Sequence, residues 1–250
     1  MRRIDNIPYH GTNDKKLDMY LPDEAGFPTV VYFHGGGLEG GSKDNPRIAD
    51  FASSFVGEGY GFVSVEYSLY SEGAHYPDYL DDCADAVGYV ASHIRREGGN
   101  GRLLISGQSA GAWISLMLCL DTPLLTSRGI SPEEIDGWII DSAQTTAHFN
   151  VIRKELHEDE RRQLINEYAP LYYLNENTKF SRMLLLCYQD DMPCRPEQNA
   201  LFSAAIKAYN ADADVELIRL PGGHCHGSSV KNPDGTYDYV TEALRWLKKR

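Results

Sequence analysis

The sequence predicts an α/β protein whose mostly parallel central sheet, of about eight strands, lies between layers of helices. Two observations lead to this fold class. Runs rich in β-branched and aromatic residues alternate along the chain with segments that carry apolar residues at helical spacing. Several of those runs, such as residues 30–33 and 103–105, are apolar without alternation, which is typical of strands buried on both faces of a parallel sheet.

Each strand is predicted from a short apolar run, and most helices from the amphipathic stretch that follows it. The predicted strands are residues 16–21, 29–33, 61–67, 102–106, 137–141, 183–188 and 215–220. The predicted helices are residues 47–58, 79–96, 110–120, 196–209 and 237–249. We found no repeat or linker, so residues 1–250 are expected to form one domain. Ligands of such folds bind at the carboxyl ends of the strands, which directs attention to the loops there.

Composition excludes several classes of partner. The chain has 36 acidic and 24 basic residues, a net charge of −12, so we expect neither a nucleic-acid nor a membrane partner. No apolar run follows the N-terminal arginines, so no signal peptide is expected. The five cysteines form no CxxC pair, which favours reduced thiols and a cytoplasmic protein. Cys194 and Cys225 each follow a candidate loop, so a disulfide between them is the alternative to free thiols.

The segment 107–111, Gly-Gln-Ser-Ala-Gly, lies between a predicted strand and a predicted helix. This is the G-x-S-x-G pattern in the context that its chemistry needs. A serine on a tight strand-to-helix turn adopts a strained backbone that exposes its hydroxyl, and the flanking glycines relieve the crowding. The N-terminus of the following helix then points at developing negative charge. We therefore predict that Ser109 is a nucleophile; the alternative is a small-residue turn without chemistry.

Three glycines follow His34 directly after the predicted strand 29–33. Consecutive glycines allow backbone N–H groups to turn toward an oxyanion, which predicts an oxyanion hole formed by the N–H groups of Gly36, Gly37 and Ala110. Phosphate binding is the competing use of such loops, but no Lys-Ser/Thr pair follows. His34 is expected to brace the loop, because a general base would have to reach the serine.

Together these motifs resemble the α/β-hydrolase fold, and within it the hormone-sensitive-lipase-like esterases and lipases with an HGGG loop. Residues 34–44, HGGGLEGGSKD, are similar to the HGGGW-x-x-G-S/D-K form of small acetyl-esterase and feruloyl-esterase-like members, with Leu38 where tryptophan is usual. Residues 65–69, VEYSL, resemble the family's Y-R-L segment, with Ser68 where arginine is usual. Residues 76–82, YPDYLDD, match its Y-P-x-x-L-x-D helix start.

The resemblance implies a triad in the chain order serine, acid, histidine. The acid is expected in the loop after the strand 183–188, where family spacing favours Asp191 over Asp190, with Asp141 a third candidate. The histidine is expected in the loop after the strand 215–220. There, the Cys-x-Gly-Ser continuation favours His224, and His226 is the alternative.

The function expected on this basis is a serine carboxylesterase that hydrolyses short-chain, acetyl-like esters of small molecules through an acyl-enzyme. The alternatives are a formamidase or lactonase with the same triad, and a non-catalytic binding protein of the same fold. No metal or cofactor is expected. Residues 145–173 are predicted to form a small lid insertion, and the charged run 153–162 within it a solvated helix. Trp113, Trp138 and Trp246 are expected in the core, and the histidines outside the motifs on the surface or in loops.

Overall fold

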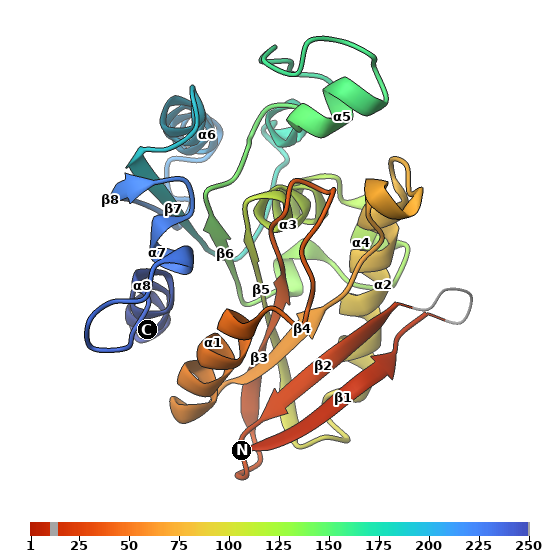
Figure 1. Cartoon of the computed structure of the whole chain (residues 1–250), viewed down its shortest axis with the longest axis vertical. Coiled ribbons are helices and arrows are strands. Elements are labelled where there is room, and N and C mark those ends of the chain that lie inside the picture. Colours follow the sequence, from red (N-terminus) through yellow and green to blue (C-terminus); the bar gives the residue numbers. More distant parts are fainter. Residues whose placement is uncertain (11–14, 250) are drawn as a thin grey trace.

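The computed structural model describes residues 1–10 and 15–249. Its centre is a sheet with the strand order β1-β2-β4-β3-β5-β6-β7-β8 (Figure 1). The strands are β1 (Arg2–Pro8), β2 (Lys16–Leu21), β3 (Phe27–Phe33), β4 (Gly61–Val65), β5 (Gly99–Gln108), β6 (Gly137–Asp141), β7 (Met183–Asp190) and β8 (Val215–Gly223). The β1–β2 and β2–β4 pairs are antiparallel, and the pairs from β4 to β8 are parallel. This confirms the predicted fold class.

Helices cover both faces of the sheet (Figure 1). They are α1 (Pro46–Gly57), α2 (Asp78–His93), α3 (Ala110–Leu120), α4 (Pro123–Thr126), α5 (Phe149–Lys154), α6 (Arg195–Tyr209), α7 (His226–Ser229) and α8 (Asp238–Leu247). Three short 3-10 helices, η1 (Tyr70–Glu72), η2 (Pro132–Glu134) and η3 (Pro170–Tyr173), lie in the connections. Side chains of α1 and α8 pack together on one face, and those of α2, α3 and α6 share a larger core on the other.

Strand β3 shows why its sequence is apolar without alternation. Successive side chains of a strand point to opposite faces. Val31 and Phe33 belong to the core beneath α2 and α3, whereas Val30 and Tyr32 belong to the core beneath α1 and α8. All three tryptophans lie in these two cores, as predicted.

Two local predictions were incomplete or wrong. Strand β1 was not predicted, because it is an exposed edge strand whose charged residues hide its pattern. The run 153–162 is not a solvated helix, because α5 ends at Lys154. His157 has a positive φ of 54°, which is incompatible with a right-handed helix at that residue. The carboxylate of Glu155 instead accepts a hydrogen bond from the backbone N–H of Tyr76 at 3.0 Å.

The described part of the chain includes no helix of the length and apolarity needed to span a membrane. All five cysteines fall within it, and each is a free thiol. Cys225 is buried and Cys194 is exposed. The alternative of a disulfide between them is therefore not seen.

Four parallel strands end directly before the residues that the motifs single out. Strand β3 ends at Phe33, directly before His34, and β5 ends at Gln108, directly before Ser109. Strand β7 ends at Asp190, directly before Asp191, and β8 ends at Gly223, directly before His224. Because these strands are parallel and adjacent in the sheet, apart from the intervening β6, the four residues gather at one edge. The topology thus brings segments far apart in sequence to a common site.

Candidate active site

Ser109 lies on a strained turn between β5 and α3. Its φ of 53° and ψ of −111° fall in a region that residues with a side chain rarely adopt. The turn is possible because α3 approaches the sheet closely: a Cβ on Gly111 would lie 2.1 Å from the carbonyl oxygen of Phe33. Any larger residue there would push the helix away from β3. The glycine therefore holds the serine at the edge of the sheet.

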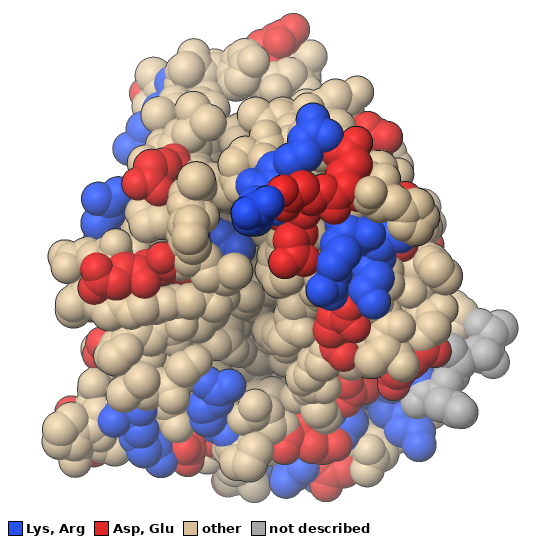
Figure 2. Space-filling view, turned by 45° about the horizontal axis from the view of Figure 1, so that its top comes forward, with Lys and Arg blue, Asp and Glu red and all other residues tan. Residues whose placement is uncertain are grey.

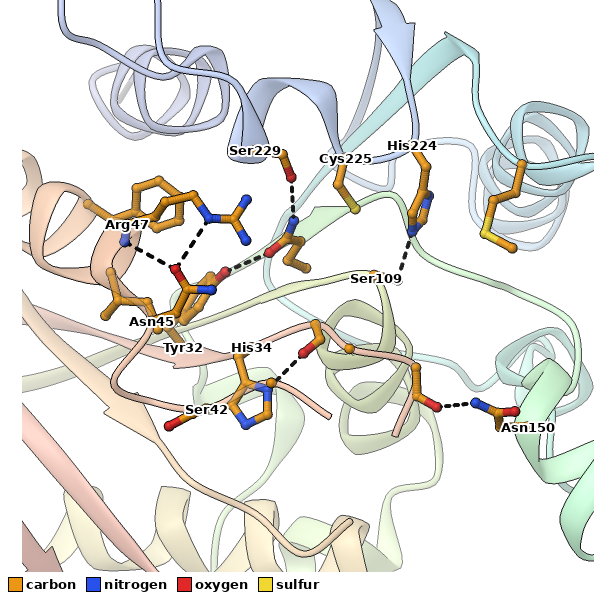
Figure 3. Close-up of a pocket in the computed structure, with 18 of the residues that line it drawn as sticks. Tyr32, His34, Ser42, Asn45, Arg47, Ser109, Asn150, His224, Cys225 and Ser229 are labelled. Atoms are coloured by element: carbon orange, nitrogen blue, oxygen red, sulfur yellow. Dashed lines mark hydrogen bonds between the residues drawn. The ribbon is translucent and has the colours of Figure 1, made fainter. Parts of the chain in front are cut away.

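A hydrogen-bonded relay connects Ser109 to two other strand ends. The Oγ of Ser109 lies 2.8 Å from Nε2 of His224, as Figure 3 shows. On the other side of the ring, Nδ1 of His224 lies 2.5 Å from Oδ1 of Asp191. The same oxygen accepts a hydrogen bond of 2.6 Å from the backbone N–H of Met192. This geometry matches that of a Ser-His-Asp triad.

The environment of Asp191 favours its charged form. Burial of the side chain opposes ionisation, but the hydrogen bond and charge of His224 outweigh it, assisted by the N–H of Met192 and the charge of Arg195. The pKa of Asp191 is therefore lowered. An ionised carboxylate at this position stabilises an imidazolium on His224.

The alternatives for the acid and the histidine lie elsewhere. Asp190 is the exposed last residue of β7, and its backbone pairs with that of Gly223. The ring of His226 packs against Gly222 at the start of α7. The structure thus brings Asp191 and His224 together with Ser109, and it brings neither Asp190 nor His226 into the relay.

Asp141, the third candidate for the acid, anchors the histidine loop instead. Its carboxylate is fully buried at the end of β6 and accepts hydrogen bonds from the hydroxyls of Tyr188, at 2.8 Å, and Ser228. Burial raises its pKa to about 6, although these two hydrogen bonds act in the opposite direction. The N–H of Cys225 also donates to Ser142, at 3.1 Å. Two bonds to the end of β6 therefore fix the segment that begins at His224.

The glycine loop after β3 bends back on itself. Gly36 has a φ of 128°, and a Cβ there would lie 2.0 Å from the carbonyl oxygen of Gly40. Only glycine fits this position. The loop brings the backbone of Gly36 and Gly37 to the same cleft as Ser109, and Ala110 follows Ser109 as the first residue of α3. These are the three residues that the sequence assigns to an oxyanion hole.

His34 braces this loop from below. Its buried ring stacks on Tyr67, with ring centroids 4.2 Å apart, and its Nε2 lies 3.4 Å from a carboxylate oxygen of Glu66. Burial opposes ionisation of Glu66, but His34, the N–H of Lys43 and the hydroxyl of Ser42 outweigh it and lower its pKa. His34 therefore contacts structural partners, in agreement with the bracing role expected from the sequence.

Helix α5, within the predicted lid insertion, is tied to the glycine loop. The side-chain amide of Asn150 donates to the carbonyl oxygen of Gly37 (Figure 3). The side chains of Arg153 and Lys154 lie 2.7 Å and 3.0 Å from a carboxylate oxygen of Glu39. These bonds hold α5 against the cleft, so the segment borders the site.

His148, which precedes α5, lies in a loop, which is one of the two places expected for it, but its side chain is buried. Its Nδ1 accepts a hydrogen bond from the N–H of Asn150 at 3.2 Å. Burial, together with the positive charges of Arg195 and His224, lowers its pKa well below the usual value. His148 is therefore a neutral helix cap, a role that depends on tertiary packing and has no signal in the sequence.

A cleft of about 530 Å³ opens at the relay. Phe149, Asn150 and Met192 line one part of it, and the glycine loop and Ser109 line another. The other part is lined by polar side chains of α1, α7 and the neighbouring loops, among them Asn45, Arg47, Gln108 and Ser229. Sequence reasoning missed Asn150 and Arg47, because neither belongs to a motif and only the fold brings them to the cleft.

Comparison with known proteins places this geometry in a family context. Residues 17–152, more than half of the chain, match the model of the BD-FAE family. The chain is 38% identical to the esterase LipI of Mycobacterium tuberculosis over 98 residues, or 39% of this chain and 30% of LipI. It is 31% identical to tuliposide A-converting enzyme b2 of Tulipa gesneriana over 92% of this chain and 67% of that protein. The alignments thus span 30% to about two thirds of these relatives.

Solved structures agree on the fold. Esterase 2 of Thermogutta terrifontis with bound propionate superposes with a TM-score of 0.75 over 96% of this chain and 91% of that one, at 21% identity. The same esterase phosphonylated by sarin gives a TM-score of 0.78, with the same coverage and 19% identity. The chain therefore has the α/β-hydrolase fold, as the resemblance implied.

Proposed function

This chain belongs to the BD-FAE family, and from that premise we propose that it is a serine carboxylesterase acting on short-chain, acetyl-like esters. The observation that carries the proposal is the relay at the strained Ser109, with 2.8 Å from its Oγ to His224 and 2.5 Å from His224 to Asp191. Relatives named as esterases support the same chemistry. A binding protein would have no need for a strained serine aligned with a histidine and a buried carboxylate.

In the first half-reaction, Nε2 of His224 takes the proton of the Ser109 hydroxyl as Oγ bonds to the acyl carbon of the ester. The imidazolium is stabilised by the carboxylate of Asp191, whose lowered pKa keeps it ionised. The N–H groups of Gly36, Gly37 and Ala110 bind the oxyanion of the tetrahedral intermediate. The C–O bond to the alcohol then breaks, and the alcohol leaves with the proton from His224.

The second half-reaction repeats these steps with water. His224 takes a proton from a water molecule, whose oxygen bonds to the acyl carbon of the acyl-enzyme. The Ser109 oxygen then leaves with that proton, and the carboxylic acid is released. The chain's own residues supply every proton transfer in this scheme.

The surroundings of Gly37 support a short acyl group. A Cβ on Gly37 would lie 3.3 Å from the ring of Phe149 and 3.2 Å from the side-chain amide of Asn150. Helix α5, which carries both side chains, is held in place through Asn150 and Glu39. The space beside the oxyanion loop is therefore narrow, and we propose that residues 145–173 act as a small lid that limits the length of the acyl chain.

The test is hydrolysis of p-nitrophenyl acetate, butyrate and octanoate by the wild type and by Ser109→Ala. We expect the highest kcat/KM on acetate and a loss of about 10⁴-fold or more in the variant. Highest activity on octanoate would contradict the short acyl preference. Activity that survives Ser109→Ala would contradict the nucleophile. A folded wild type inactive on all three esters would favour an amide or lactone substrate, or the binding protein.

A further inference from the structure

Among the side chains that line the cleft, the permanently charged one is the guanidinium of Arg47, which the proposed mechanism does not use. It lies on α1, and Figure 3 shows it across the cleft from Ser109, on the side of Asn45 and Ser229. None of the described residues that line the cleft is an aspartate or a glutamate. Arg47 thus brings a positive charge to a cleft free of carboxylates, in a chain with a net charge of −12.

The partners of Arg47 are neutral. Its Nη1 donates to the backbone carbonyl of Ser228 at 3.0 Å, and its Nε donates to Oδ1 of Asn45 at 3.3 Å. Across residues 1–10 and 15–249, no carboxylate lies within ion-pair distance of Arg47 and no partner of Nη2 is seen. Asp50, one turn further along α1, pairs with Lys231 at 2.8 Å. Within the described part of the chain, the positive charge of Arg47 therefore has no counter-charge.

The guanidinium is also held in place before any ligand binds. Oδ1 of Asn45 accepts from both the backbone N–H and Nε of Arg47, at 3.1 Å and 3.3 Å. Together with the bond to Ser228, this fixes the side chain at both ends of its polar group. A side chain that is already ordered loses little conformational entropy on binding, and a planar guanidinium favours a carboxylate.

Arg47 lies close to the reacting atoms through a short chain of contacts. The carbonyl that it binds belongs to Ser228, and the hydroxyl of the next residue, Ser229, accepts from the amide of Gln108 at 3.3 Å. Gln108 directly precedes Ser109. A substrate whose ester lies at Ser109 can thus reach Arg47 within the same cleft of about 530 Å³, a volume typical of small-molecule sites.

Figure 2 shows this distribution of charge on the surface. The molecule is hollowed near the middle of the face, and a blue basic group is recessed there, while red and blue groups are mixed on the raised surface around it. An anionic substrate that enters the hollow is attracted by the positive charge inside it. Binding there is favourable only for a group that can reach the recessed cation.

We propose that Arg47 is a specificity-determining residue that binds a carboxylate on the acyl or the alcohol part of the ester. This rests on the proposed esterase function and narrows its substrate class to esters of small molecules that carry a negative charge. The carboxylate would accept hydrogen bonds from Nη2 and from Nη1, and Nη1 would also keep its hydrogen bond to the carbonyl of Ser228. Such charge-assisted bonds are stronger than those between neutral groups.

The experiment compares kcat/KM for matched pairs of esters that differ in one charge. With the carboxylate on the alcohol, the pair is 4-acetoxybenzoate and 4-acetoxybenzamide. With the carboxylate on the acyl part, it is monomethyl succinate and methyl butyrate, whose hydrolysis is followed by proton release. We expect the wild type to favour the anionic member of at least one pair by about tenfold or more. The pair that shows the preference identifies the part of the ester that faces Arg47.

Three variants assign the preference to this residue. Arg47→Gln should abolish the selectivity ratio, and Arg47→Lys should retain part of it, because the charge remains but the planar fork is lost. Lys231→Gln removes the same charge from a nearby residue outside the lining of the cleft and should leave the ratio unchanged. Equal kcat/KM for both members of both pairs would overturn the proposal, as would a ratio that Arg47→Gln does not change.

A second measurement does not depend on the folding of any variant. The anionic preference of the wild type should shrink as sodium chloride rises from about 0.02 M to about 0.5 M, because salt screens the charge. A preference independent of salt would count against Arg47. The proposed esterase function is judged separately, by the hydrolysis of the neutral esters and its loss in Ser109→Ala.

Discussion

The two ends of the cleft differ in how a positive charge is compensated. At the Ser109 end, the positive charge that the proposed mechanism places on His224 faces the carboxylate of Asp191, which accepts a hydrogen bond from the N–H of Met192. At the Arg47 end, the partners of a permanent positive charge among the described residues are a carbonyl oxygen and an amide oxygen. A charge made during a reaction needs compensation inside the protein. A charge that recognises a ligand must be left for the ligand to neutralise.

The largest expected effect is at the histidine and tests the Ser109 end directly. We predict that His224→Gln lowers kcat/KM on p-nitrophenyl acetate by about 10⁴-fold or more, because no base then takes the proton of Ser109. His226→Gln is the matched control, since its ring packs against Gly222 outside the relay. Its kcat/KM should stay within about threefold of the wild type. The reverse order of effects would move the general base to His226.

The next effect separates two adjacent aspartates. We predict that Asp191→Asn lowers kcat by about 10³- to 10⁴-fold, because the amide cannot stabilise the imidazolium. Asp190→Asn, at an exposed position outside the relay, should change kcat by less than about twofold. Steady-state kinetics on p-nitrophenyl acetate measures both. Similar losses in the two variants would show that the chosen carboxylate is not the orienting group.

Asp191 also has a predictable effect on stability against pH. Its pKa is lowered in the folded protein, so its ionised form stabilises the fold above the ordinary pKa of 3.8. That contribution is lost as the pH falls through the lowered folded pKa. The free energy of unfolding, measured in urea, should therefore fall more for the wild type than for Asp191→Asn as the pH is lowered below 4. Parallel curves for the two proteins would contradict the lowered pKa.

Asp141 is expected to respond to pH in the opposite direction. Burial raises its pKa from 3.8 to about 6, so the unfolded chain releases its proton before the folded protein does. Stability that is present below pH 3.8 is then lost as the pH rises to about 6. The two-unit shift corresponds to about 3 kcal/mol at most.

The variant Asp141→Asn isolates this contribution. Its free energy of unfolding, measured relative to the wild type in urea, should rise between pH 4 and pH 6.5. The same carboxylate anchors the histidine loop through Ser228, so some activity is also expected to be lost. A difference in stability that is constant across this pH range would show that Asp141 is not held protonated by burial.

The smallest expected effect concerns the stability contributed by the Arg47 end. Arg47 forms two hydrogen bonds to neutral oxygens and no ion pair among the residues described. We predict that Arg47→Gln changes the free energy of unfolding by less than about 1 kcal/mol. Denaturant unfolding at pH 7 measures it. A much larger loss would mean that Arg47 supports the fold. Its charge would then not be one that is left for a ligand to neutralise.

Much of this architecture was predictable because its signals are local. Ser109 and the glycines around it are recognisable since a strained turn and a close helix approach require particular residues at fixed spacing. The strands of the parallel sheet were found because burial on both faces makes them uniformly apolar. The family resemblance then favoured Asp191 and His224, the residues that the fold brings to Ser109.

The rest depends on contacts that no short segment encodes. The residues alone left Asp190 and Asp191 open because they are adjacent at the end of β7, and the structure distinguishes them by the direction of the side chain. Arg47 and Asn150 reach the cleft only through the packing of α1 and α5 beside the glycine loop. The run 153–162 has helical composition, but tertiary contacts at Glu155 replace the helix.

The measurement that tests the central proposal most directly is covalent labelling with a fluorophosphonate. The Ser109 oxygen should displace fluoride from phosphorus, and peptide mapping by mass spectrometry should find the phosphonyl group on Ser109. We predict stoichiometric labelling of the wild type at this residue, much slower labelling of His224→Gln and none of Ser109→Ala at that peptide. Hydrolytically active protein that stays unlabelled at Ser109, or is labelled at another serine, would contradict the account.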